Sequence, residues 1–122
     1  MFNVLAVGFG GFLGSILRYL IGLIPVTETC LFPIKTFSIN VLGCFVIGMV
    51  TLYMSKHLEL SPYMSLFLKV GLCGGFTTFS TFALETTDLL KSGHVLIAAL
   101  YVALSVMVGI AVIFAVEYFA VK

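Results

Sequence analysis

Long apolar stretches alternate with short polar segments along the whole chain. The apolar stretches cover approximately residues 3–24, 34–54, 62–90 and 95–119. Each has at least the ~20 residues that an α-helix needs to cross ~30 Å of hydrocarbon at ~1.5 Å per residue. The pattern therefore predicts one membrane domain of four transmembrane helices over residues 1–122.

The segments between these stretches contain residues that end or begin helices. Pro25 closes the first stretch, and Ser61-Pro62 supplies a capping residue before a proline at the first helical position of the third. The first stretch has no basic segment ahead of it and no clear cleavage site, so we interpret it as a retained helix rather than a signal peptide.

Composition supports a polytopic membrane protein. Hydrophobic residues make up 61% of the chain and charged residues 9%, whereas soluble domains have ~45–50% and ~25%. A net charge of +1 gives no footprint for nucleic acid. Cys30, Cys44 and Cys73 lack the spacing of metal ligands, so we expect Cys44 and Cys73 to act as small apolar side chains.

The basic residues that flank the stretches leave the orientation in the membrane open. Lys56 and Lys122 lie on the side of the termini, and Lys35 and Lys91 lie on the other side. Such a balance allows insertion both ways and an antiparallel pair of copies, although it also occurs in proteins with one orientation. A chain this short has little interior, so we expect any pathway through it to need a second copy.

The third stretch carries an unusual run of glycines, hydroxyls and phenylalanines near its middle. Paired glycines weaken a helix, and hydroxyls can bond to backbone groups that lose helical partners, so we expect a break at Gly74-Gly75. Non-helical backbone at membrane depth is tolerated where protein buries it or where it lines a cavity. Freed carbonyls there could bind sodium, while hydroxyls and phenyl edges could bind a small anion. The run is Gly74, Gly75, Phe76, Thr77, Thr78, Phe79, Ser80, Thr81 and Phe82.

Two polar side chains in the other stretches have both a structural and a functional interpretation. Arg18 either extends toward the membrane surface or forms an anion-attracting vestibule. Asn40 either joins helices or presents its two amide hydrogens to a permeating anion. The residues near the same helix face as Asn40 are Thr36, Gly43 and Ile47.

Small residues at helical spacing occur in the first and last stretches. Gly10 and Gly14 are four apart, which is typical of close packing between helices. Tyr101, Ser105 and Gly109 form a second stripe, which either packs closely or extends a polar pathway.

Together these motifs resemble the Fluc family of fluoride channels, also called CrcB. The family's N-terminal pattern G-G-x-x-G-x-x-x-R is matched by Gly10, Gly11, Gly14 and Arg18. Its pattern N-x-x-G is matched by Asn40 and Gly43, and its pattern G-x-x-G-G-x-T-T-F-S-T-F by residues 71–82. The matches occur in the same order along the chain.

The resemblance implies an all-α integral protein of the cell membrane that exports fluoride passively and confers fluoride resistance. It implies an antiparallel, dual-topology homodimer with two pores and a structural sodium ion bound by backbone carbonyls of Gly74 and Thr77 from each copy. Glu85 would lie at the end of a vestibule, and Arg18 would have a vestibule or structural role. The pore residues that the resemblance implies are Asn40, Phe79, Ser80, Thr81, Phe82, Tyr101 and Ser105.

Two other functions are compatible with a short four-helix membrane chain. A proton-coupled drug exporter similar to the small multidrug resistance proteins needs an acidic residue in the first stretch, where Arg18 is the charged side chain. A non-transporting assembly subunit would not need the hydroxyls between Gly74 and Phe82. We do not expect an enzyme, because no nucleophile–base pair or set of metal ligands is apparent.

Overall fold

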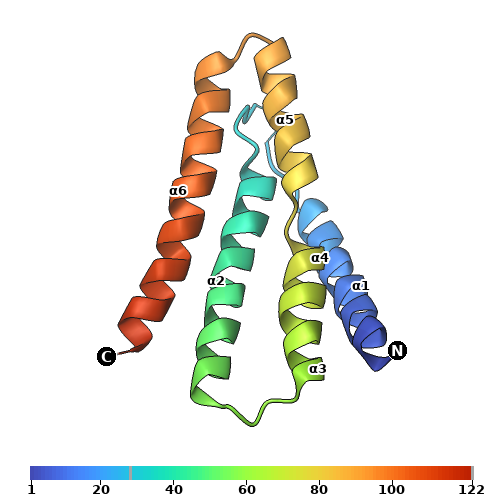
Figure 1. The fold of residues 1–122 in the computed structure, drawn as a ribbon. Helices are drawn as coiled ribbons and strands as arrows, with labels where there is room; N and C mark the ends of the chain where they lie inside the picture. The colour runs from blue at the N-terminus through green and yellow to red at the C-terminus, as the bar shows by residue number, and fades with distance from the viewer. Residues whose placement is uncertain (28, 122) are drawn as a thin grey trace.

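Four membrane-length helical segments run alternately up and down in the computed structural model, which describes residues 1–27 and 29–121 (Figure 1). The first segment is α1 (Phe2–Gly22), the second is α2 (Ile34–Lys56) and the fourth is α6 (Val95–Ala120). The third consists of α3 (Pro62–Ser65), the π-helix η1 (Leu66–Cys73), α4 (Gly74–Phe76) and α5 (Phe79–Lys91). Each segment is long and apolar enough to cross a membrane, so the predicted helical architecture is confirmed.

The predicted start of the third segment is also confirmed. The Ser61 hydroxyl accepts a hydrogen bond from the backbone N–H of Tyr63, and Pro62 occupies the first helical position. At the other end, Gly93 adopts a φ of 83°, a left-handed conformation that lets the chain turn from α5 into α6.

The π-helix η1 is a feature that the sequence pattern did not predict. Its bonds run from residue i to i+5, which widens the helix, and such stretches occur frequently at functional sites. Here η1 is followed by α4, and the interruption of the third segment comes directly after α4.

Glycines let α1 and the third segment approach until their backbones touch. A Cβ atom at Gly10 would clash with the carbonyl of Phe67, and one at Gly14 would clash with the carbonyl of Leu72. Gly75 faces α1 in the same way, because its Cβ would lie 2.6 Å from the carbonyl oxygen of Gly11. The predicted packing role of Gly10 and Gly14 is therefore confirmed.

The position of the helix break corrects the sequence prediction. Gly74 and Gly75 are helical, and the extended residues are Thr77, with ψ of 160°, and Thr78, with φ of −148° and ψ of 117°. Gly75 serves close packing, and the break occurs one turn later, where a side chain from α2 replaces the lost helical bond. A sequence does not show which helix covers a glycine, so the pattern alone does not distinguish a glycine that serves packing from one that breaks a helix.

Lysines at both ends of α2 bond to the last carbonyls of neighbouring helices. Lys35 Nζ donates to the carbonyl of Gly22 at 2.8 Å, and Lys56 Nζ donates to the carbonyl of Ala120 at 2.7 Å. A cation is favourable at a helix C-terminus. Lys122, one of the four lysines that flank the apolar stretches, lies outside the described residues, so insertion in both orientations remains a prediction.

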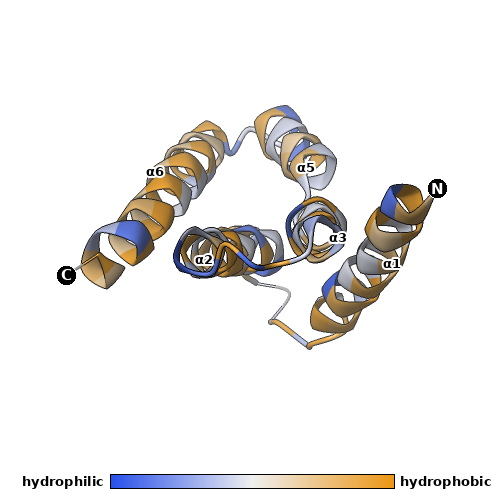
Figure 2. Cartoon of the chain, turned by 60° about the horizontal axis from the view of Figure 1, so that its bottom comes forward, coloured by the Kyte–Doolittle hydropathy of each residue, from blue (hydrophilic) through white to orange (hydrophobic). Residues whose placement is uncertain are grey.

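The interior is small, and large apolar side chains cover the outside. The buried cluster consists of Leu89, Ala98 and Tyr101, where α5 meets α6. Figure 2 shows apolar residues along most of α6, and side chains such as Phe79 are 78% exposed. Such a surface suits lipid or a second copy, and the four segments make this a multi-pass protein of the cell membrane.

Candidate functional site

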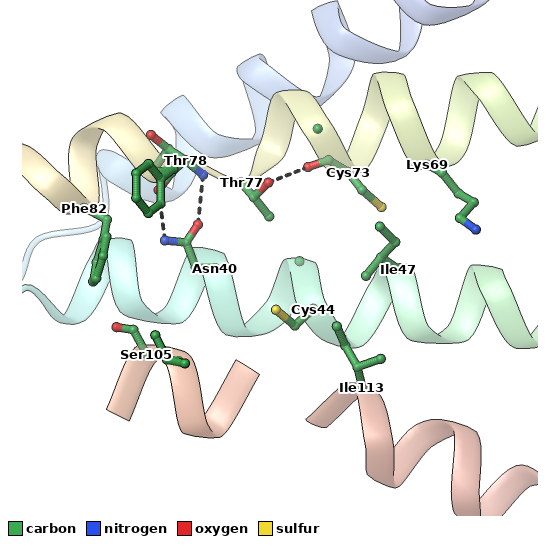
Figure 3. Close-up of a pocket in the computed structure, with 14 residues that line it drawn as sticks. Asn40, Cys44, Ile47, Lys69, Cys73, Thr77, Thr78, Phe82, Ser105 and Ile113 are labelled. Carbon is green, nitrogen blue, oxygen red and sulfur yellow. Dashed lines mark hydrogen bonds between the residues drawn. The ribbon is translucent and has the colours of Figure 1, made fainter. Parts of the chain in front are cut away.

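The interrupted helix is held by the side chain of Asn40 on α2. Its Oδ1 accepts a hydrogen bond from the backbone N–H of Thr78 at 2.8 Å, and its Nδ2 donates to the carbonyl of Thr78 at 3.1 Å (Figure 3). One amide thus satisfies both backbone groups of an extended residue at membrane depth, where an unsatisfied group costs several kcal/mol. Asn40 thus joins helices. Its Nδ2 carries a second N–H that these two hydrogen bonds do not use.

The break frees backbone carbonyls that a continuous helix would use. The Thr78 N–H would normally bond to the carbonyl of Gly74, but Asn40 takes it instead. The carbonyl of Cys73, one residue earlier, accepts from both the backbone N–H of Thr77 and its hydroxyl, at 3.0 and 2.9 Å. Gly74 therefore lacks its usual helical partner and is exposed.

Hydroxyls also fix the start of α5. The Thr78 hydroxyl accepts from the backbone N–H of Thr81 at 3.2 Å and donates to the Thr81 hydroxyl at 3.0 Å. Thr78 is therefore the N-cap of α5, with the extended backbone that caps adopt.

A cavity of about 450 Å³ lies beside the break, between α2, the third segment and α6 (Figure 3). Phe79, Phe82 and Asn40 border it near the break, and Lys69 borders it at the opposite end. Most of the remaining lining is apolar, including Cys44, Cys73, Ile47 and Ile113. Apart from Lys69, the polar groups of the cavity are therefore few and gathered near the break.

Ser105 on α6 contributes a hydroxyl that no group of the described residues satisfies. Its Oγ is buried and has no hydrogen-bond partner among the described residues. The side chain borders the cavity, where it points into the space near Phe82 and Asn40 (Figure 3). An unpaired buried hydroxyl is unfavourable by ~1–3 kcal/mol, so this position is poorly suited to structure alone.

A second cluster of polar side chains lies on the α5 side of the break, where three helices meet. Glu85 on α5 accepts from the Thr36 hydroxyl of α2 at its Oε1 and from the Tyr101 hydroxyl of α6 at its Oε2, both at 2.7 Å. Thr36 is 5% exposed and Tyr101 is 0% exposed, whereas Glu85 is half-buried. The bonds are short, as expected for hydroxyls donating to a carboxylate.

Aromatic rings connect the polar residues at the break with the polar cluster around Glu85. The ring centroids of Phe79 and Phe82 are 5.8 Å apart, and those of Phe82 and Tyr101 are 5.0 Å apart. Ser105 lies one helical turn from Tyr101, so hydroxyls and ring edges follow each other from the break to Glu85. Ring edges carry partial positive charge, and hydroxyls donate hydrogen bonds. This arrangement is chemically suited to a small anion.

A family model described as "CrcB-like protein, Camphor Resistance (CrcB)" matches residues 5–116. The chain belongs to the CrcB family. Two curated relatives, each named "Fluoride-specific ion channel FluC", are similar to most of this CrcB chain. The one from Chlorobaculum tepidum is 49% identical over 115 residues, which are 93% of this chain and 90% of the relative. The one from Flavobacterium psychrophilum is 46% identical over 112 residues, 90% of each chain. These names describe channels, in agreement with the expectation that the chain is not an enzyme.

The structure brings together only some of the residues that the CrcB resemblance implied. Asn40, Phe79, Phe82 and Ser105 border the cavity. Gly74 and Thr77, the residues implied for sodium, also border it. Tyr101 and Glu85 do not border the cavity, and neither do Ser80, which is exposed, Thr81, which bonds to Thr78, and Arg18. Tyr101 bonds to Glu85, which is half-buried between helices. The vestibule role of Glu85 stays a prediction.

Arg18 has no hydrogen bond or ion pair with another described residue, and it is half-exposed on α1. Its contribution to this CrcB chain therefore stays open between the vestibule and structural interpretations. Among the described residues, no group of three or more His, Cys, Asp and Glu could hold a metal ion.

The contact of Thr36 with Glu85 is the part of the site that sequence reasoning missed. Thr36 was placed on the face of Asn40, and Glu85 was singled out separately, but they are 49 positions apart. The available signal was a carboxylate within a span, which needs partners, since ionisable groups inside membranes are paired. The identity of the partners depends on helix packing.

Proposed function

We propose that this protein is a fluoride-selective ion channel through which fluoride leaves the cytoplasm passively and which confers fluoride resistance. The observation that carries the proposal is the buried, unpartnered hydroxyl of Ser105, beside Asn40 and the Phe79–Phe82 pair. Relatives named as fluoride channels supply the identity of the ion.

A selective pore must replace the water that surrounds a strongly hydrated anion. The donors available near the break are the Ser105 hydroxyl and the second N–H of Asn40, together with the ring edges of Phe79 and Phe82. Ser80 and Thr81 would join them if the chain around the start of α5 moved or a second copy completed the wall. Lys69 stands at the far end of the cavity, so it attracts anions without binding them at the break.

At the Glu85 end, the permeating ion must compete with a carboxylate for donors. The hydroxyls of Thr36 and Tyr101 both point at Glu85. A fluoride ion that arrives from Ser105 would take over the Tyr101 hydroxyl while the Glu85 side chain turns away. Binding at this step is thus limited by the carboxylate, which helps the ion to leave.

We further propose that two copies assemble antiparallel, in both membrane orientations, with two pores and one structural sodium ion between them. Support comes from Gly74, which is exposed and whose carbonyl has lost its helical partner, and from the extended backbone of Thr77. Carbonyl oxygens suit a hard cation, and backbone carbonyls of Gly74 and Thr77 from each copy would hold it. The ion would fix the two breaks against one another.

Fluoride efflux from liposomes tests the proposed function directly. Purified protein is reconstituted with internal potassium fluoride, a potassium ionophore is added, and parallel vesicles contain potassium chloride. We expect rapid release of fluoride without release of chloride. Absence of fluoride release from a well-folded preparation would contradict the proposal and favour a non-transporting role.

A further inference from the structure

A fourth ring continues the aromatic series past Tyr101, and it comes from the loop between α1 and α2. The centroids of Phe32 and Tyr101 are 5.3 Å apart with an interplanar angle of 79°, an edge-to-face contact. Phe32 also meets Phe37 of α2 edge-to-face, at 5.4 Å and 72°. Phe32 therefore lies against the cluster of Leu89, Ala98 and Tyr101.

The loop that carries Phe32 is tied down locally. Among its described residues, the backbone N–H of Cys30 bonds to the carbonyl of Thr27, and the carbonyl of Phe32 accepts from the backbone N–H of Ile34. The Cys30 thiol also donates to the carbonyl of Phe32, at 3.4 Å. These bonds join neighbouring positions, so the ring of Phe32 is a principal link between this loop and the α5–α6 cluster. In Figure 1 the loop runs between α5 and α6 above the start of α2.

Tyr101, which lies beneath this ring, is closed off from the outside. Tyr101 is 0% exposed, and its hydroxyl is occupied by Glu85. The cavity beside the break is bordered by Phe82 and Ser105 but not by Tyr101, Thr36 or Glu85. An ion that reached Tyr101 from the cavity would thus meet a packed cluster before it met water.

We propose that Phe32 is the outer gate of the permeation pathway and limits the rate at which the ion leaves the Tyr101–Glu85 end. This inference rests on the proposed function and names a residue that controls it. The ion passes when the Phe32 ring separates from Tyr101, and the ring edges of both residues face the ion as it does so. A loop with mainly local hydrogen bonds can make this movement without unwinding a helix.

A size series at position 32 tests the gate by fluoride efflux. Phe32→Trp, Phe32→Leu and Phe32→Ala leave the charges of the pathway unchanged and change the volume of the gate. We expect the release rate to rise in the order Trp, Phe, Leu, Ala. Since ring pairs of this kind contribute modestly, the Ala variant should release fluoride roughly threefold to tenfold faster than the unchanged protein. The control is Phe9→Ala, which removes a ring that contacts Phe12 and Phe67 on the other side of the bundle.

A second measurement reports whether the Phe32 ring covers Tyr101, and it does not depend on transport. The protein is labelled with 3-fluorotyrosine, and the Tyr101 resonance is assigned with a Tyr101→Phe variant. A water-soluble gadolinium chelate then broadens the resonances of exposed rings. We expect the Tyr101 resonance to be protected in the unchanged protein and in Phe9→Ala, and to broaden progressively in Phe32→Leu and Phe32→Ala.

The two measurements separate the gate from the channel. If the unchanged protein releases no fluoride, the proposed function fails, and broadening of Tyr101 in the variants still shows whether Phe32 covers it. If the unchanged protein conducts, a release rate in Phe32→Leu equal to or below it overturns the gate, whatever the exposure of Tyr101. Phe32→Leu keeps the test valid if Phe32→Ala does not fold.

Discussion

At the scale of single residues, two polar side chains that border the cavity, Asn40 and Ser105, have different roles. Asn40 completes two backbone hydrogen bonds across the break, so it contributes to folding. The Ser105 hydroxyl completes none among the described residues, so it contributes nothing to folding by hydrogen bonding. Substitution of these residues should therefore separate stability from transport.

Ser105→Ala should reduce fluoride flux without loss of stability. An unpaired buried hydroxyl destabilises by ~1–3 kcal/mol, so its removal should leave the thermal midpoint in detergent unchanged or higher. Loss of one pore donor should slow efflux by roughly tenfold, the equivalent of about 1.4 kcal/mol. The matched control is Ser55→Ala, whose hydroxyl bonds to the carbonyl of Leu52 on an exposed surface. Unchanged flux in Ser105→Ala would remove this hydroxyl from the pathway.

Phe79→Ile and Phe82→Ile should each cripple fluoride flux and leave the assembled protein intact. Isoleucine keeps most of the apolar volume but has no ring edge with partial positive charge. Phe114→Ile is the control, because Phe114 is 68% exposed on α6 and does not border the cavity. Flux and size-exclusion profiles are compared, and flux at the level of the unchanged protein in both test variants would show that the rings are packing residues.

At the scale of elements, the sequence predicts the four segments and the start of the third, because apolar runs and capping residues are local signals. The sequence predicts the break a few residues early, because Gly75 faces Gly11 and Thr78 faces Asn40, and neither pairing is local. The π-helix η1 and the Thr36–Glu85–Tyr101 group depend on packing in the same way. The residues of the site were identified in the sequence, but their grouping was not.

Asn40→Ala should destabilise the third segment. The substitution leaves the N–H and C=O of Thr78 without their partner. Because Thr78 is buried, we expect the free energy of unfolding to fall by ~2–3 kcal/mol. The thermal midpoint in detergent should fall, in contrast to that of Ser105→Ala. Asn40→Asp keeps an acceptor for the Thr78 N–H, so its thermal midpoint should fall less than that of Asn40→Ala. Equal midpoints for Asn40→Ala and the unchanged protein would show that water satisfies the break.

At the scale of the whole molecule, the two adjacent glycines distinguish packing within one copy from packing between copies. A Cβ at Gly75 would lie 2.6 Å from the carbonyl oxygen of Gly11, so Gly75→Ala must push α1 away from the third segment. A Cβ at Gly74 would have only the carbonyl oxygen of Lys69 nearby, at 4.0 Å, and the backbone there is helical. The single chain therefore has room for Gly74→Ala, which should stabilise it by ~0.4–1 kcal/mol.

If two copies meet at the break, Gly74→Ala should weaken their association although it suits the fold of each. The measurement is the dimer fraction against dilution in detergent, with and without sodium, for Gly74→Ala and for Gly8→Ala, whose added methyl has no described atom within 4 Å. We expect a lower dimer fraction for Gly74→Ala but not for Gly8→Ala. Sodium should also raise the dimer fraction of Gly74→Ala by a smaller amount. Gly75→Ala should instead lower the thermal midpoint at every concentration. Indistinguishable dilution curves for Gly74→Ala and Gly8→Ala would place the interface elsewhere, since a surface that binds a second copy through the break has no space for a methyl group there.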